Sequence, residues 1–308
     1  MRALIVTPES ALVTLADVPE PELHRDDVLV RVHAFSLNRG EVTRLLSPPH
    51  GWQPGWDFAG VVEQPNGSDL SVGDRVLGVV RQGAWAEYVA APRGHLGAVP
   101  DTVTFAEAAS LPIAGLTALR SLRVAGPILG RSVLITGAGG SVGRFAIQLA
   151  TLGGAETCAL VRSESHVGGL QALGAPVVAT SIETLDSEFD LILETVGGET
   201  LGKAMLKLTP QGRLVIIGNT SNELTTFDAR GFYPGGSRQL IGFALPATYA
   251  ADPPALDLSY LAAEVARGRL DPQVAEVFDW YQMETAIDHM RYNSSAGRTV
   301  LRTSAEPG

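Results

Sequence analysis

Apolar and polar residues alternate along much of the first hundred residues. Between residues 27 and 34 every second position is apolar, whereas Arg31 and His33 fall on the opposite side. This pattern is typical of a strand with one buried face, so we expect His33 to be solvated. The same reasoning predicts a strand at the start of the chain and others over residues 58–63, 75–80 and 86–90. The first part of the chain therefore predicts a β-rich domain.

A different pattern begins near residue 131, where short apolar segments alternate with amphipathic stretches. The apolar segments predict strands over residues 132–136, 157–162, 177–179, 189–194, 213–217 and 239–243. The stretches between them predict helices over residues 142–152, around 170 and over 201–208. Apolar strands separated by helices are typical of a parallel, doubly wound α/β sheet.

The junctions of these two patterns suggest the domain limits. Thr104 and Glu107 have the spacing of a helix capping box, and a further helix is predicted over residues 114–123. After Pro246 the chain predicts helices over 256–267 and 283–290 and a strand over 298–302, which we interpret as a return to the first domain. The predicted organisation is residues 1–110 and 248–308 in one domain and 111–247 in the other.

The composition and net charge limit the classes of molecule that the protein is expected to bind. Hydrophobic residues make up 45% of the 308 residues and charged residues 18%, as in a globular chain with a sizeable core. A net charge of −10 disfavours nucleic acid and anionic lipid as partners. We see no signal-peptide pattern and no apolar run of membrane-spanning length, and we expect a cytoplasmic protein.

Metal-binding residues are scarce. Cys158 is the only cysteine, so the chain has neither an intrachain disulfide nor a cysteine-rich zinc site. The six histidines share no metal-ligand spacing. We therefore expect no metal.

A glycine-rich segment follows the predicted strand 132–136 and opens the predicted helix 142–152. Such a loop lets the backbone approach a pyrophosphate, whose charge is met by free N–H groups and by the helix dipole. The strand, loop and helix context predicts a dinucleotide site. Its residues are Gly137, Ala138, Gly139, Gly140, Ser141, Val142 and Gly143.

The end of the next predicted strand bears on the choice between NADPH and NADH. A basic or hydroxyl-bearing residue there accepts the 2′-phosphate of NADPH, whereas an acidic residue binds the ribose 2′-hydroxyl of NADH. Arg162 and Ser163 favour NADPH, and Glu164 leaves NADH open. His166 is also close enough in sequence to face the phosphate.

The chain resembles the medium-chain dehydrogenase/reductase superfamily, and within it the zinc-free quinone oxidoreductase-like and enoyl reductase branch. The resemblance covers nearly the whole chain and rests on ordered motifs at residues 36–38, 55–62, 72–76, 83–89, 116–118, 137–143, 194–198 and 212–219. It implies a GroES-like catalytic domain, a Rossmann domain, a cleft between them and a homodimer. It also implies hydride transfer from NADPH to a small-molecule quinone or to the activated C=C bond of an enone.

The resemblance assigns further contacts to the cofactor. It places Thr117, Gly218 and Asn219 beside the nicotinamide and its ribose, and Val196 and Gly197 on the adenosine side. Other residues that it assigns to the cofactor site are Phe243 and Leu245, which border the nicotinamide, and Arg298, which takes the place of a basic residue near the C-terminus. A plain surface charge is the alternative interpretation of Arg298.

The zinc-dependent members of this superfamily carry metal ligands where this chain has Asn38 and Trp56. The resemblance therefore implies zinc-independent chemistry. Thr43 lies nearest to the place of a tyrosine found in many relatives, and its hydroxyl is a weak acid. The proton donor thus stays open.

Asn38 and Thr43 are the catalytic candidates. The Asn38 amide would donate to a substrate carbonyl or a ribose hydroxyl, and the alternative is a turn-forming asparagine. Trp52, Trp56 and Tyr249 are weaker candidates for a substrate pocket. Two other functions remain open: a biosynthetic enoyl reductase for an acyl or polyketide-like intermediate, and a non-enzymic NADPH-binding relative.

Overall fold

The computed structural model describes residues 1–6, 13–49, 51–292 and 297–303. Its contacts divide the chain into two compact units. Unit 1 comprises Met1–Leu116 and Pro246–Gly308, and unit 2 comprises Thr117–Leu245. The chain passes from the first unit to the second within helix α3 (Pro112–Val124).

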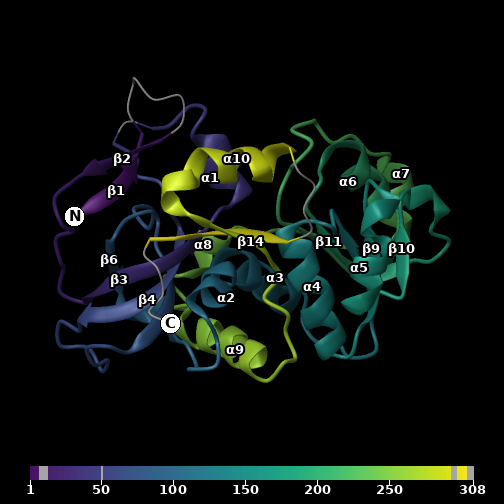
Figure 1. The fold of residues 1–308 in the computed structure, drawn as a ribbon. Coiled ribbons are helices and arrows are strands. Elements are labelled where there is room, and N and C mark those ends of the chain that lie inside the picture. Colours follow the sequence, from purple (N-terminus) through teal and green to yellow (C-terminus); the bar gives the residue numbers. More distant parts are fainter. Residues whose placement is uncertain (7–12, 50, 293–296, 304–308) are drawn as a thin grey trace. The chain divides into compact units, whose positions relative to one another are not determined.

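Unit 1 is built on a seven-stranded sheet with the order β14-β15-β3-β4-β5-β7, and β6 also pairs with β3. Figure 1 labels β3, β4, β6 and β14 of this sheet. The strands of this sheet are β3 (Asp27–Ser36), β4 (Asp57–Gln64), β5 (Arg75–Val79), β6 (Tyr88–Pro92), β7 (Leu96–Ala98), β14 (Val274–Asp279) and β15 (Arg298–Arg302). A separate antiparallel pair joins β1 (Arg2–Ile5) and β2 (Thr14–Asp17). The helices are α1 (Arg39–Arg44), α2 (Phe105–Ser110), α8 (Leu245–Thr248), α9 (Ala255–Ala266) and α10 (Met283–Tyr292).

Strand β3 is buried on both faces, which corrects the sequence-based expectation. All of its residues from Val28 to Ser36 are buried except Arg31. His33 is only 7% exposed and stacks on the ring of Phe105, with ring centroids 4.5 Å apart. Phe105 is the first residue of α2, which packs on β3 and covers the face predicted to be solvated. Helix packing thus overrides the alternating pattern.

The capping box that begins α2 is confirmed. The Glu107 N–H donates to Thr104 Oγ1 at 3.2 Å, and the Thr104 N–H donates to Glu107 Oε2 at 2.8 Å. Two otherwise unpaired backbone donors at the helix start are satisfied in this way, which typically stabilises a helix by about 1 kcal/mol. This cap sets the point where α2 begins to cover β3.

Unit 2 is a six-stranded sheet with the order β10-β9-β8-β11-β12-β13, and all of its strand pairs are parallel. The strands are β8 (Ser132–Thr136), β9 (Glu156–Leu160), β10 (Val177–Ala179), β11 (Phe189–Glu194), β12 (Leu208–Ile216) and β13 (Gln239–Gly242). The helices that follow them are α4 (Ser141–Leu152), α5 (Val167–Ala172), α6 (Gly198–Met205) and α7 (Ala229–Phe232). The α/β prediction for this part of the chain is confirmed.

The strand order makes β8 and β11 the central pair. From β8 the chain continues outward to β9 and β10, and it then crosses back to β11 and continues outward on the other side. In doubly wound sheets the crevice at such a reversal, outside the carboxyl ends of the strands, is where ligands bind. A ligand is therefore expected to bind at the loops after β8, β9, β11 and β12.

No helix in the described ranges combines the length and the apolar character needed to cross a bilayer.

Candidate active site

The loop after β8 has the shape that a bound pyrophosphate requires. Gly137 adopts φ +57°, which favours glycine, and an added side chain there would collide with Thr195. A Cβ atom on Gly143 would lie 2.6 Å from the Cα atom of Ala138, so only glycine lets α4 approach the loop this closely. Gly140 is the N-cap of α4 and is exposed, which leaves the helix N-terminus open to an anion.

The loops after β11 and β12 contact each other directly. The Ser221 N–H donates to the Val196 carbonyl at 2.8 Å, and the Asn219 side chain lies directly against Gly197. Gly218 lies close to the Thr195 backbone. The structure thus brings together Val196, Gly197, Gly218 and Asn219, which the resemblance assigned to the cofactor, beside the glycine loop that Thr195 contacts.

Glu194 is the residue that sequence reasoning missed in this region. Its buried carboxyl group accepts hydrogen bonds from the N–H groups of Val196 and Gly197 at 2.9–3.1 Å and from Thr136 Oγ1 at 3.0 Å. Burial raises the pKa of Glu194, and these donors oppose the rise. The carboxyl group fixes the loop after β11 to the end of β8. The signal was the position of an acidic residue at the end of a buried strand.

The loop after β9 carries the residues that distinguish the two dinucleotides. Arg162, Ser163 and Glu164 are exposed, and the Ser163 hydroxyl lies 2.9 Å from the Ser165 hydroxyl. Arg162 forms no ion pair with any residue in the described part of the chain. The His166 ring lies against Gly139 of the glycine loop. This loop therefore faces the glycine loop, as a dinucleotide site requires.

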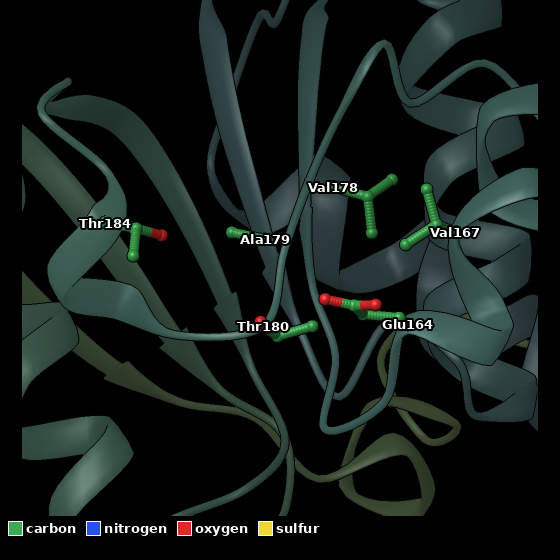
Figure 2. A pocket seen from close by; sticks show the side chains of 6 residues that line it. All are labelled: Glu164, Val167, Val178, Ala179, Thr180 and Thr184. Carbon is green, nitrogen blue, oxygen red and sulfur yellow. The ribbon is translucent and has the colours of Figure 1, made fainter.

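A concavity of about 440 Å³ opens between the segments that follow β9 and β10. In Figure 2 the side chains of Glu164 and Thr180 point toward each other, and those of Val167 and Val178 lie beside them. Its lining residues are Glu164, Val167, Val178, Ala179, Thr180 and Thr184. Glu164 is thus on the concavity, whereas Arg162 lies outside its lining.

The remaining predicted cofactor contacts lie in α4, after β13, in α3 and at the start of α8. Ser141 and Val142 form the partly buried first turn of α4. Phe243 follows β13 and is partly buried, whereas Leu245 and Thr117 are buried. Their contact with the nicotinamide stays a prediction.

In unit 1, Asn38 is the N-cap of α1, and its side chain is committed to a buried polar cluster. Its amide nitrogen Nδ2 donates to Glu41 Oε2 at 2.7 Å and to Asp57 Oδ2 at 3.1 Å, while its oxygen accepts from Arg298 at 3.0 Å. Both amide hydrogens therefore have carboxyl partners inside the protein. This differs from the expected role, in which the amide points to a substrate carbonyl.

Arg298 is buried and is not a surface charge. Its side chain is 3% exposed, and its guanidinium group lies 3.3 Å from Asp57 Oδ2 and also donates to the Ser36 hydroxyl. Burial lowers its pKa, while Asp57 and Glu41 raise it. Arg298 thus binds polar side chains in the interior of unit 1. The cofactor contact assigned to it has no support from these partners.

An exposed cation lies over two tryptophans next to this cluster. The Arg44 guanidinium carbon, at the end of α1, is 5.6 Å from the Trp52 ring centroid and 5.9 Å from that of Trp56. Trp52 is buried and Trp56 is partly buried, so the aromatic pair offers only part of its surface. Thr43 precedes Arg44 and is exposed. Helix α1 therefore connects the buried cluster to a basic aromatic surface.

Tyr249 is buried in unit 1. Its ring meets that of His95 edge to face, with centroids 5.1 Å apart. A role for Tyr249 in substrate binding stays a prediction. Among the described residues, no group of three or more His, Cys, Asp or Glu side chains could hold a metal ion.

Two family profiles match the chain. The profile described as "Alcohol dehydrogenase GroES-like domain" matches residues 24–101, and the one described as "Zinc-binding dehydrogenase" matches residues 174–301. The first match lies in unit 1 and the second includes residues of both units, while residues 102–173 are matched by neither profile. The chain belongs to the medium-chain dehydrogenase/reductase superfamily. Within it, the chain falls in the quinone oxidoreductase-like branch.

Individual members of the superfamily agree with this placement. The chain is 32% identical to 2-methylene-furan-3-one reductase of Solanum lycopersicum over 66% of its own length, and 30% identical to NADPH-dependent alkenal/one oxidoreductase of Arabidopsis thaliana over 66%. It spans 57% and 58% of the lengths of these relatives. The quinone oxidoreductase from Coxiella burnetii superimposes with a TM-score of 0.84 at 26% identity and covers 99% of each chain. Oxidoreductase chemistry with a pyridine nucleotide is the activity of this family.

Proposed function

We propose that this protein is a zinc-independent, NADPH-dependent reductase of quinones or of the activated C=C bond of enones. The observation that carries the proposal is the set of loops at the carboxyl ends of β8, β9, β11 and β12. An open helix N-terminus, a glycine loop that excludes side chains and a buried carboxyl group that fixes the neighbouring loop together suit a dinucleotide pyrophosphate.

The preference for NADPH rests on Arg162. Its exposed guanidinium group forms no ion pair with a described residue and follows β9, where the ribose 2′-substituent binds in this fold. Ser163 adds a hydroxyl group. The relative from Arabidopsis thaliana, an NADPH-dependent alkenal/one oxidoreductase, supports the same choice. Glu164 opposes it, because a carboxylate on the concavity would repel a phosphate and could bind a ribose hydroxyl instead.

The substrate would meet the surface formed by Arg44, Trp52 and Trp56. NADPH, when bound, would supply a hydride, and addition of that hydride to the electrophilic carbon would leave negative charge on the conjugated oxygen of the substrate. The Arg44 guanidinium group over the two indoles would offer N–H donors to that oxygen, and the exposed part of Trp56 would offer an aromatic surface to a planar quinone or enone. Because the superfamily's metal-ligand positions hold Asn38 and Trp56, we propose that this arrangement works without zinc.

The test is a panel of substrates with purified protein and NADPH. Quinones, alkyl enones and acyl thioesters are compared by the rate of NADPH consumption. We expect turnover of quinones or enones and little of the thioesters. Exclusive use of acyl thioesters would instead identify a biosynthetic enoyl reductase. Tight NADPH binding without consumption of any substrate would indicate a non-enzymic relative.

We also propose a homodimer formed through strand β13. It is the last strand on its side of the unit 2 sheet, so the N–H and C=O groups on its outer side pair with no other strand of the described chain. Leu240 in this strand is 41% exposed, and Leu224, Phe227 and Tyr233 in the preceding segment are also exposed. Open sheet edges with exposed apolar side chains are typical sites of pairing with a second chain.

A further inference from the structure

Five side chains form a buried polar cluster in unit 1. Glu41 lies on α1 and Asp57 on β4, and both are fully buried. Arg298 on β15, Ser36 on β3 and Asn38 before α1 complete the cluster. The Asn38 amide nitrogen donates to one oxygen of each carboxyl group and thereby joins them.

The charges of this cluster do not balance if both carboxyl groups are ionised. Two carboxylates and one guanidinium group would leave one uncompensated negative charge where water has no access. An uncompensated buried charge is far more costly than the loss of a single hydrogen bond. The charged groups that act most strongly on Glu41 are Asp57 on β4 and Arg298 on β15. One bound proton makes the cluster neutral.

The contacts of the two carboxyl groups favour Glu41 as the one that would hold that proton. Asp57 has the guanidinium group of Arg298 at 3.3 Å, and both of its oxygens accept from the Ser36 hydroxyl at 2.9 Å. Glu41 uses only Oε2, which accepts from the Asn38 backbone N–H at 3.0 Å and from its amide at 2.7 Å. Glu41 Oε1 is buried and has no hydrogen-bond partner among the described residues. A proton on Oε1 neutralises this oxygen, and a buried neutral group without a partner costs far less than a buried anion without one.

We propose that Glu41 is a neutral carboxylic acid in the native protein, with its proton on Oε1, and that it positions the Asn38 side chain at the start of α1. The neutral acid still accepts both hydrogen bonds from Asn38 through Oε2. It therefore fixes the start of α1, the helix that carries Arg44 at its other end, without placing a second negative charge beside Asp57. This inference does not depend on the identity of the cofactor or substrate.

Burial, reinforced by the charge of Asp57, raises the pKa of Glu41 well above its usual range. The pKa of Asp57 is also raised by burial, but Arg298 opposes that rise most strongly. The unfolded chain loses the Glu41 proton above a pH of about 4.3, whereas the native protein keeps it. Since the native state then binds more protons, its stability falls as the pH rises from that value toward the native pKa of Glu41.

Infrared spectroscopy of wild-type protein and Glu41→Gln at neutral pH tests the proposal directly. The amide that this substitution introduces is neutral and has nearly the shape of the acid. We expect the wild-type spectrum to contain one protonated-carboxyl C=O band that the variant lacks. The control variant Glu63→Gln, at an exposed glutamate, should lose a carboxylate band and no acid band. Loss of a carboxylate band in Glu41→Gln would overturn the proposal.

Denaturant unfolding between about pH 5 and about pH 8 gives a second measurement. The stability of the wild type should fall more steeply with rising pH than that of Glu41→Gln, and parallel curves would overturn the proposal. If Glu41→Gln fails to fold, ¹³C-glutamate labelling of the Glu194→Gln variant decides the matter. A protonated glutamate must persist there at neutral pH, and its absence would contradict the proposal.

Discussion

Arg162 is the residue whose substitution separates the two dinucleotides. We predict that Arg162→Ala weakens NADPH binding by about 10- to 150-fold, because a charge-assisted hydrogen bond contributes about 1.5–3 kcal/mol. NADH affinity should hardly change, since NADH has no 2′-phosphate. Fluorescence titration of both dinucleotides measures this. The control is Arg131→Ala, an exposed arginine just before β8 at the opposite end of the strands. Equal losses for both dinucleotides would contradict the assignment.

Asp57 is a buried residue whose substitution should strongly destabilise unit 1. We predict that Asp57→Asn lowers the free energy of unfolding by about 3–5 kcal/mol, because the buried Arg298 guanidinium group loses its carboxylate. Urea denaturation measures the change. Asp69→Asn is the matched control, since Asp69 pairs with Arg93 at the exposed surface, and its stability should stay near that of the wild type. Similar free energies of unfolding for Asp57→Asn and Asp69→Asn would show that the buried pair of Asp57 and Arg298 does not stabilise the fold.

The glycine loop could be recognised in the sequence, whereas the buried polar cluster of unit 1 could not, and the difference has a physical reason. The glycine loop could be recognised because its requirements are local: a strand, a close backbone approach and a helix start. The cluster of Asn38, Asp57 and Arg298 could not, because Asn38 and Arg298 are 260 positions apart and meet only in the folded sheet. Asn38 was therefore interpreted as a substrate-facing donor, and Arg298 as a cofactor contact or a surface charge.

At the scale of elements, the close contact between α4 and the glycine loop is open to a direct test. We predict that Gly143→Ala abolishes measurable NADPH binding, because the new methyl group overlaps the Ala138 backbone and displaces the loop. Gly168→Ala is the control, since Gly168 is also helical but has open space around it. Dinucleotide titration and circular dichroism of both variants make the comparison. Unchanged NADPH affinity in Gly143→Ala would contradict the role of this loop.

The elements themselves were predictable where packing followed the local pattern. Strands β10, β11 and β15 have the limits that the sequence predicts. Prediction from the local pattern fails at strand β3. Helix α2 packs on the face of β3 that the alternating pattern predicted to be exposed, and such a contact with a distant element cannot be recognised from the alternation of residue types. Short α1 was missed as well. This helix is only six residues long and is capped by Asn38 and Glu41. The residues around them show too little hydrophobic periodicity to predict a helix.

At the scale of the whole molecule, the proposed dimer depends on the open edge at β13. We predict that Leu240→Lys converts the dimer to a monomer, because a charge on this exposed edge opposes pairing with a second copy. Light scattering coupled to size-exclusion chromatography measures the mass. Leu129→Lys is the control, since Leu129 is 81% exposed and precedes β8, away from the β13 edge. A monomeric wild type, or a Leu240→Lys variant that remains dimeric, would exclude this interface.

The most direct test of the proposed function is the rate of cofactor oxidation by chelator-treated protein with one quinone, compared between NADPH and NADH. Because Arg162 is available for the 2′-phosphate and the metal-ligand positions hold Asn38 and Trp56, we predict full activity without zinc. We also predict a kcat/KM for NADPH at least about 10-fold above that for NADH. Activity that returns only when zinc is added, or a preference for NADH that is lost in Glu164→Gln, would contradict the proposal.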